Sequence, residues 1–550
     1  MRFTKGMLIA LVLFSVITNS FGQVEERQRP EEWKNLVKGG KFIDLFQRIP
    51  PIGTLTEETW GADVVVPRYV ANGIEDQEWS YWGGKIIYGN DGKYHLYVCR
   101  WREDSPKGHA EWPNSIVVHA VSDTQMGPFQ VKEEIGKGHN PEIYQTETGE
   151  YVIFVTDGHY RSQSLNGPWE YGQFDFDARD REIIEGLSNL TFAKREDGSY
   201  LMICRGGGVW LSEDGIGTYN QVSDRRVYPA VDGRFEDPVI WKDNVQYHLI
   251  VNDWLGRIAF YQRSKDGIHW KTDPGEAYMP GITIYTDGTE EKWFKYERIK
   301  IFQDELGRAT QANFAVIDTL KAEDKPNDTH SSKNIGIPLK VGRQMELINK
   351  KEITSNTKSI KVLLKAEQEF DPKKDLDISS LRFGASEEVN FGKGSKVLET
   401  KDVGNDLEIT FSSEGNGFTK QNFAGKLLGR NIQGEMIFAY CKLPWVDYLE
   451  PELSARKPLI SSDNKTITVV IENFGQVKSK GSQVEIWMDK AGEEVLLAKG
   501  NVSALSSFGS VEVEMDYKLA LTRGESVKLL VSVFESKDDG ETFEISTVVN

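Results

Sequence analysis

A short two-strand unit recurs five times between residues 84 and 318, and this repeat restricts the fold more than any other feature of the chain. Each copy has a strand that begins with polar residues, a tight turn, and an apolar return strand that ends in polar residues, as in 138–144 followed by 151–159. A period of about 50 residues is typical of one β-propeller blade per repeat. The copies lie 57, 48, 49 and 60 residues apart when they are counted from Gly84, Pro141, Asn189, Pro238 and Arg298.

A second signature runs in phase with the first. A serine stands six or seven residues before an aromatic residue, with glycine between them, as in 264–270. Such a turn lets the aromatic side chain of an outer strand pack beneath it. Four copies of this turn and five of the hairpin predict a five-bladed β-propeller. The four copies begin at Ser122, Ser162, Ser212 and Ser264.

The first 22 residues have the features of a secretory signal peptide. Arg2 and Lys5 precede an apolar run over 7–17, and small residues follow at 20–22. This apolar run is too short for a membrane span with such flanks, and no later stretch approaches one. We therefore predict a secreted or periplasmic protein without a membrane span.

The remaining domain boundaries follow from changes in composition and in the pattern of predicted strands. Residues 23–78 are polar and interrupted by prolines, and form an extension that is a candidate to close the propeller; the blade repeats predict a catalytic propeller over 79–343. Beyond them the strands are short and lack the blade signature. This pattern predicts a β-sandwich over 344–445 and an immunoglobulin-like β-sandwich over 455–550. The predicted fold class is all-β.

Charge and motifs exclude several kinds of partner. The formal net charge is −18, which disfavours nucleic acid as a ligand. The chain has no metal-binding spacing such as His-Glu-x-x-His, and no glycine-rich loop that opens a helix. No metal site and no cofactor are predicted, although a structural calcium ion is compatible with the sequence.

The polar residues at the strand ends should converge. In a propeller the start of the innermost strand and the end of the next strand lie at the same end of the blade. Carboxylates, arginines and aromatic rings gathered in one funnel suit a saccharide site, since acids act on the glycosidic bond while rings stack on the sugar. The predicted substrate-binding residues are Trp82, Arg100, His139, Asn140, Asp157, His159, Arg205, Glu236, Asp253 and Arg298.

Three short motifs resemble those of five-bladed propeller glycosidases, with glycoside hydrolase family 43 and its relatives the nearest pattern. The motifs are 184–186 (Ile-Glu-Gly), 236–238 (Glu-Asp-Pro) and 139–142 (His-Asn-Pro-Glu). The resemblance implies that Glu185 is the general acid, and it makes Asp237 and Glu142 further catalytic candidates. The family's general base is an Asp that opens the first blade, where this chain has Gly83 and Gly84. The general base is therefore not assigned.

These features predict an exo-acting glycoside hydrolase that attacks oligosaccharides from plant or algal polysaccharides. Arg100, Arg205 and Arg298 would favour a uronate or sulfated sugar, unless they only pair with funnel carboxylates. Two alternatives stay open. His139 and His159 could abstract a proton in a polysaccharide lyase, and a propeller without the first-blade Asp could bind glycans without catalysis.

Overall fold

The structure is a computed structural model that describes residues 24–57, 64–183, 187–490, 493–535 and 541–550. Nearly all regular structure in these ranges is β-strand, which confirms the all-β prediction. None of the described helices is long and apolar enough to cross a membrane. The elements that stand outside the large sheets are η1 (Glu31–Asn35), η2 (Phe42–Leu45), β1 (Leu55–Thr56), β2 (Arg68–Tyr69) and η3 (Gly108–Asn114).

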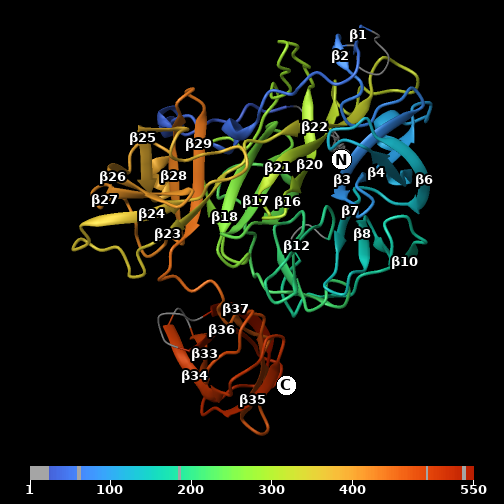
Figure 1. Ribbon diagram of the computed structural model, residues 1–550. Coiled ribbons are helices and arrows are strands. Elements are labelled where there is room, and N and C mark those ends of the chain that lie inside the picture. Colours follow the sequence, from blue (N-terminus) through green and yellow to red (C-terminus); the bar gives the residue numbers. More distant parts are fainter. Residues whose placement is uncertain (1–23, 58–63, 184–186, 491–492, 536–540) are drawn as a thin grey trace, which may run out of the picture.

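Five sheets follow one another along the chain (Figure 1), and their hairpins match the five sequence repeats. The first contains β3 (Trp79–Tyr88), β4 (Tyr94–Arg102), β5 (Ile116–Ser122) and β6 (Gln130–Lys137). The second contains β7 (Glu142–Gln145), β8 (Tyr151–Val155), β9 (Gly158–Ser162) and β10 (Glu170–Gly172). The third contains β11 (Phe176–Asp177), β12 (Thr191–Lys194), β13 (Tyr200–Ile203), β14 (Val209–Ser212) and β15 (Tyr219–Gln221).

The fourth sheet contains β16 (Phe235–Lys242), β17 (Tyr247–Asp253), β18 (Ile258–Ser264) and β19 (Lys271–Thr272). The fifth contains β20 (Lys295–Gln303), β21 (Ala309–Ile317) and β22 (Ser332–Pro338). Within each sheet successive strands pair antiparallel, except that β11 joins β15 in parallel.

The first strands of the five sheets form a ring. Strand β3 contacts both β7 and β20, and β16 contacts both β12 and β20. The hydroxyl of Thr191 on β12 donates a hydrogen bond to Glu142 on β7. The arrangement is β-propeller-like, with polar groups on the innermost strands and apolar clusters between neighbouring sheets, such as the one that joins Phe154 to Met202.

The serine turns close the outer strands as the sequence predicts. In each of the four copies the serine Oγ accepts a hydrogen bond from a backbone N–H two or three residues further on, as from Gly267 to Ser264 at 2.8 Å. In the last copy the indole N–H of Trp270 also donates to the Gly267 carbonyl at 2.9 Å. Each turn therefore fixes the edge of its sheet.

The segment before β3 lies along the outer edge of the fifth sheet. Ile74 forms a β-bridge with Asn334 of β22. The side chain of Asn72 both donates to and accepts from Gly336 of the same strand, at 3.1 and 2.9 Å. These contacts add backbone partners to a sheet that has only three strands of its own.

The segment predicted as the first β-sandwich instead forms a closed barrel. The strands run in the order β23-β24-β27-β26-β25-β28-β29, and a parallel pairing between β23 and β29 closes the barrel. The sandwich prediction is wrong here because β25 pairs with both β26 and β28. The strands therefore form one continuous hydrogen-bonded sheet instead of two separate sheets. The barrel elements are β23 (Arg343–Leu347), β24 (Ser359–Leu364), β25 (Leu376–Gly384), α1 (Ser386–Val389), β26 (Ser395–Val403), β27 (Asp406–Ser412), β28 (Ala424–Asn431) and β29 (Met436–Lys442).

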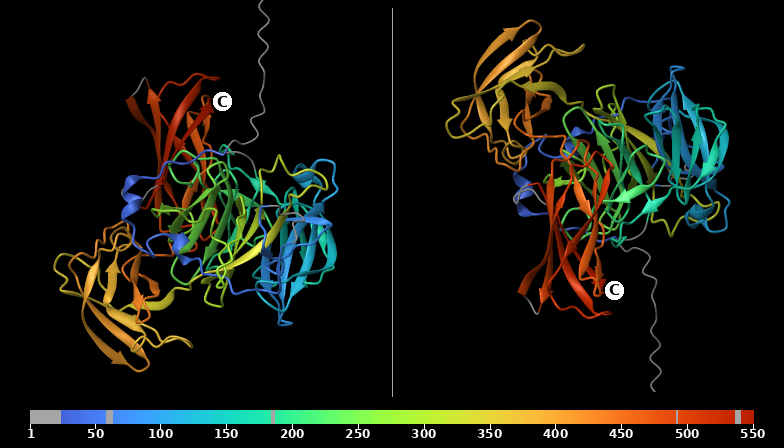
Figure 2. Two further views of the ribbon diagram at one scale, coloured as in Figure 1. Left: turned by 90° about the horizontal axis from the view of Figure 1, so that it is seen from above. Right: turned by 90° about the horizontal axis from the view of Figure 1, so that it is seen from below.

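The C-terminal domain has two four-stranded sheets that share one apolar core. One contains β30 (Leu453–Ala455), β31 (Leu459–Ser461), β32 (Thr466–Asn473) and β35 (Ser510–Asp516). The other contains β33 (Ser482–Lys490), β34 (Glu493–Val502), β36 (Ser526–Phe534) and β37 (Glu541–Val548). The barrel and this domain extend from the ring in different directions (Figure 2).

The C-terminal domain is attached to the third sheet by a buried arginine. The guanidinium of Arg179 donates to Glu472 at 2.7 Å and to the hydroxyl of Ser454 at 3.0 Å, and it lies over the ring of Phe474. Its side chain is fully buried. Buried charges persist where hydrogen bonds satisfy them, so this contact makes the domain part of the folded assembly.

Candidate functional site

One residue from the start of each innermost strand faces the axis of the ring. All five have positive φ angles near 50°, and β-bulges interrupt strand pairing beside three of them. A bulge redirects a side chain, and non-glycine residues in this conformation are strained and concentrate at functional sites. We call this set the axial ring: Gly83, Asn140, Asn189, Asp237 and Arg298.

Hydrogen bonds connect the axial ring. The amide of Asn140 donates to the side-chain oxygen of Asn189, and the Asn189 amide donates to Oε1 of Glu236, both at 3.0 Å. Arg298 approaches the same Glu236 oxygen at 3.5 Å and forms an ion pair with Asp237. The polar groups at the axis are thus held by one another before any ligand arrives.

A cavity of about 910 Å³ opens where the innermost strands begin, and we call it the central cavity. Its lining includes Asn140, Asn189 and Arg298 of the axial ring. It also includes three tryptophans, namely Trp82, Trp112 and Trp254. Six cationic side chains line it: Lys107, Arg205, Lys295, Arg298, Lys321 and Lys325.

Among the described residues that line the central cavity, Glu236 is the one carboxylate. Its side chain is 13% exposed, and Oε1 lies 3.8 Å from the Arg205 guanidinium and 3.5 Å from that of Arg298. The Asn189 amide fixes the orientation of the carboxylate. This geometry leaves one carboxylate open to a ligand, between two guanidinium groups.

The other two described catalytic candidates lie away from the cavity. Asp237 is buried against Arg298, whose backbone N–H donates to it at 3.2 Å. Burial raises the pKa of Asp237 to about 6, although Arg298 opposes this rise. Asp237 does not line the central cavity, although it borders a small adjoining cavity together with Asn140, Asn189 and Arg298.

Glu142 likewise does not line the central cavity. Its side chain is fully buried, and it forms ion pairs with Lys300 and with Lys85, the latter at 3.1 Å. Burial acts to raise the pKa of Glu142, but the two ammonium groups outweigh it and hold the pKa below its usual value. Glu142 therefore serves as the centre of a buried ionic cluster. The third candidate, Glu185, lies outside the described residues.

Of the ten predicted substrate-binding residues, six line the central cavity. They are Trp82, His139, Asn140, Arg205, Glu236 and Arg298. The other four point elsewhere. Asp157 is exposed beside the second sheet, and His159 packs against Phe174 with ring centroids 4.5 Å apart.

Arg100 and Asp253 are held by other parts of the chain. Arg100 stacks over Trp79 at 3.9 Å and pairs with Glu134 at 2.9 Å. Asp253 is fully buried and accepts hydrogen bonds from Arg27 and from the backbone of Arg234. Neither residue lines the central cavity, and both still belong to strands, β4 and β17.

Two histidines, His139 and His109, line one side of the cavity next to tryptophan rings. Nδ1 of His139 forms a hydrogen bond with the hydroxyl of Ser115 at 2.9 Å, and Trp112 packs on the His139 ring. His109 lies edge-on to Trp82, 4.7 Å between ring centroids. Burial lowers the pKa of both His139 and His109 well below the usual value. Both imidazoles are therefore neutral at pH 7.

The sequence reasoning missed the segment 320–325. The polar composition of 321–334 predicts a surface loop, yet Lys321 and Lys325 line the cavity and Asp324 is 2% exposed. Asp324 lies 3.8 Å from Nδ1 of His109, and burial raises its pKa to about 8. Gly108 allows this approach, because a Cβ there would lie 2.0 Å from the Asp324 carbonyl oxygen.

A metal centre is not evident in the described part of the chain, where no group of three His, Cys, Asp or Glu side chains could hold an ion. The cavity is lined by aromatic rings, cationic side chains and Glu236. These groups can stack on a sugar ring, bind an oxyanion and exchange a proton.

No family model and no curated protein matches this chain. Similar solved structures include a glycoside hydrolase with 10% identity and a TM-score of 0.35, covering 80% of this chain and 95% of that chain. A variant of the GH43 protein BlXynB from Bacillus licheniformis has 10% identity and a TM-score of 0.32, covering 88% and 90%. A thermostable family-43 glycoside hydrolase has 12% identity and a TM-score of 0.28, covering 49% and 90%. Similarity at this level does not establish a function for this chain.

Proposed function

We propose that this protein is a glycoside hydrolase and that its substrate is an oligosaccharide with a carboxylate or sulfate group, bound in the central cavity. The supporting observation is the combination of three tryptophans and six cations around one carboxylate, Glu236. Aromatic faces stack on sugar rings, and guanidinium groups bind carboxylate or sulfate in a fork geometry. The notable feature is that this cationic cavity occurs in a chain with a net charge of −18.

Arg205 is the cation that we assign to the anionic group of the substrate. Lys321 and Lys295 are balanced by Glu297, and Arg298 is balanced by Asp237. Arg205 has a weaker engagement, since its nearest carboxylate oxygen, on Glu236, is 3.8 Å away. Most of its donors therefore stay free for a ligand, and a concave site concentrates their field.

Catalysis would require one group that protonates the leaving oxygen and one that activates water. We propose Glu236 as one of the two, because it is the described carboxylate in the cavity lining. The resemblance to family 43 still implies Glu185 as the general acid, and Ser188, three residues along the chain, lines the cavity.

The remaining parts of the proposal concern architecture and location. We propose that the five sheets are the five blades of a propeller and that the two-sheet C-terminal domain is immunoglobulin-like. We also propose exo action, because η3 and residues 320–325 meet at His109 and Asp324 and wall one side of the cavity. Residues 1–22 would direct the protein to the periplasm or the cell exterior as a signal peptide.

The reaction class can be tested by incubating the protein with plant and algal oligosaccharides and measuring the masses of the products by mass spectrometry. A hydrolase adds water to each cleaved bond, and we expect this mass change with uronate-containing or sulfated substrates. An unsaturated product that absorbs in the ultraviolet would instead identify a lyase. Retention of an oligosaccharide without turnover would identify a binding protein, and either result would overturn the proposal.

Substrate charge can be tested with a matched pair of variants. We expect Arg205→Ala to weaken binding of a uronate-terminated oligosaccharide at least about 30-fold, the lower range for loss of a buried charged partner. Its effect on the neutral analogue should be small. Arg100→Ala is the control, because Arg100 occupies the equivalent position of the repeat but pairs with Glu134 outside the cavity. Equal losses for both ligands in Arg205→Ala would contradict an anionic substrate.

A polysaccharide lyase is the second candidate, and His139 is the observation that favours it. A lyase needs a base that removes the proton next to a uronate carboxylate, while cations neutralise that carboxylate. The neutral imidazole of His139 lines a cavity that also contains Arg205 and Arg298. The partner histidine that the sequence suggested, His159, packs in the second sheet instead.

A further inference from the structure

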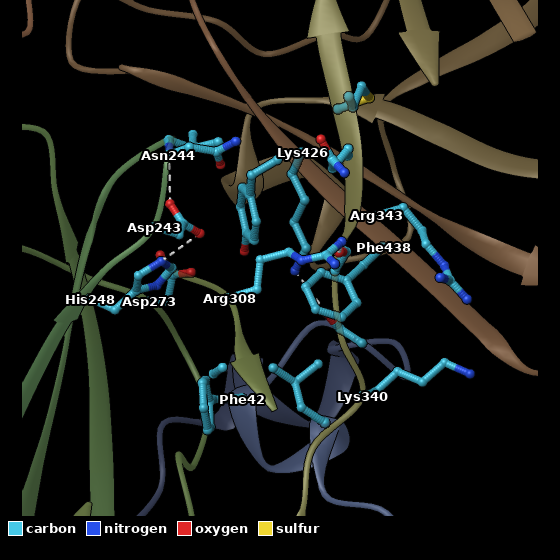
Figure 3. Close-up of a pocket in the computed structure, with 18 of the residues that line it drawn as sticks. Phe42, Asp243, Asn244, His248, Asp273, Arg308, Lys340, Arg343, Lys426 and Phe438 are labelled. Atoms are coloured by element: carbon cyan, nitrogen blue, oxygen red, sulfur yellow. Dashed lines mark hydrogen bonds and ion pairs between the residues drawn. The ribbon is translucent and has the colours of Figure 1, made fainter. Parts of the chain in front are cut away.

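A second cavity lies between the fourth sheet, η2 and the barrel, and we call it the junction cavity (Figure 3). Its volume is about 140 Å³, against about 910 Å³ for the central cavity, so it suits a smaller ligand. It shares no lining residue with the central cavity.

The carboxylates on the sheet side of the junction cavity are already engaged. Asp243 accepts hydrogen bonds from His248 at 3.0 Å and from two backbone N–H groups. Asp273 accepts two from the guanidinium of Arg263, at 2.9 and 2.8 Å. Asp273 is therefore shared, because it pairs with Arg263 and also favours the charged form of Lys426 without forming an ion pair with it.

The opposite wall carries a lysine whose ammonium group forms no ion pair among the described residues. Lys426 on β28 is 4% exposed, and its ammonium group donates to the Gly39 carbonyl at 2.7 Å and to Asn390 Oδ1 at 2.6 Å. Both acceptors are neutral, and no carboxylate in the described ranges forms an ion pair with it. A buried ammonium without a direct acidic partner is costly, and burial lowers the pKa of Lys426 to about 8, although the more distant Asp273 and Asp44 oppose this fall.

Two arginines reinforce the positive wall. Arg308 and Arg343 approach the same carboxylate, Glu367, at 2.8 and 3.6 Å, and Arg308 also pairs with Asp304 at 2.8 Å. The buried Nε of Arg343 has no hydrogen-bond partner. Figure 3 shows Lys426 and Arg308 directed toward the middle of the cavity, beside Phe438.

We propose that the junction cavity binds a small ligand with one oxyanion group and a ring-shaped body, the class that includes uronic acids and sulfated monosaccharides. The carboxylate or sulfate accepts hydrogen bonds from Lys426 and from the arginine pair, and it gives the Lys426 ammonium a direct anionic partner. The body of the ligand packs on the ring of Phe438. The ligand thereby joins the fourth sheet to the barrel, at a site separate from the proposed catalytic cavity.

The probe is D-glucuronate, with D-glucose as its neutral match. Because the central cavity is also proposed to bind such a ligand, titrations are made in the Arg205→Ala background by calorimetry. We expect one site for D-glucuronate, at least ten-fold weaker binding of D-glucose, and a melting temperature that rises with D-glucuronate concentration.

Lys426→Met in this background should weaken D-glucuronate at least ten-fold and abolish the melting shift. Arg343→Gln, at a more exposed position, should weaken binding several-fold and gives the answer if Lys426→Met fails to fold. Lys528→Met is the control, because Lys528 is exposed on the C-terminal domain and pairs with Glu544. Unchanged binding in Arg343→Gln and in any folded Lys426→Met protein would overturn the site. Loss of turnover on oligosaccharides would not bear on it.

Discussion

Replacement of Glu236 by Gln is expected to lower kcat by at least about 10²-fold, the lower range for loss of general acid or base assistance. Gln has the same shape and keeps the hydrogen bond from Asn189, so KM should change little. The reason for choosing Glu236 is its position, since it is the described carboxylate that lines the central cavity between Arg205 and Arg298. The measurement is steady-state hydrolysis of an oligosaccharide found in the product screen.

The control for this variant is Glu134→Gln. Glu134 is exposed and pairs with Arg100 on the outside of the first sheet, so its loss should leave kcat unchanged. Melting temperatures of both variants should stay close to that of the native protein, because neither change alters packing. Near-normal turnover in Glu236→Gln would remove Glu236 from the reaction and leave Glu185 as the remaining carboxylate to test.

The hairpins of the repeat were predicted correctly where one local signal agreed with another. The hairpin at 142–155 combines a turn at Gly149 with a continuous apolar return strand, and the structure has β7 and β8 there. The barrel could not be predicted in this way. Its closure depends on the pairing of β23 with β29, which lie about 90 residues apart, and no local pattern specifies such a pairing.

The site was predictable at the level of strand ends but not of side-chain directions. Arg100 and Arg205 occupy equivalent places in the repeats, yet β4 continues to Arg102 whereas β13 ends at Ile203. Arg205 therefore lies in a turn beside the cavity, while Arg100 remains on a strand face. The length of a strand beyond its last apolar residue cannot be read from the repeat alone.

The same limit applies to the carboxylates at the axis. Glu236 and Asp237 are neighbours in the Glu-Asp-Pro motif, and the sequence favoured Asp237 by resemblance. The β-bulge between Glu236 and Val239 instead directs Asp237 beneath Arg298 and leaves Glu236 in the cavity lining. A bulge shifts which residue faces the axis, and its position follows from tertiary packing rather than from the motif.

Glu142→Gln is expected to destabilise the ring of five sheets by about 3–5 kcal/mol, the range for removing one partner of a buried ion pair. The change leaves the ammonium group of Lys300, 9% exposed, without its carboxylate. Lys85 is 21% exposed and can turn toward solvent, so most of the cost should come from Lys300. Turnover per folded molecule should stay near normal, because Glu142 does not line the central cavity.

The measurement is urea unfolding followed by tryptophan fluorescence, with activity assayed on the folded fraction. The double variant Glu142→Leu/Lys300→Met provides the sharper test. Replacement of a buried ion pair by apolar residues of similar volume is often neutral or stabilising, so much of the lost stability should return. A Glu142→Gln protein that is as stable as the native one but inactive would place Glu142 in the reaction and contradict its role as the centre of an ionic cluster.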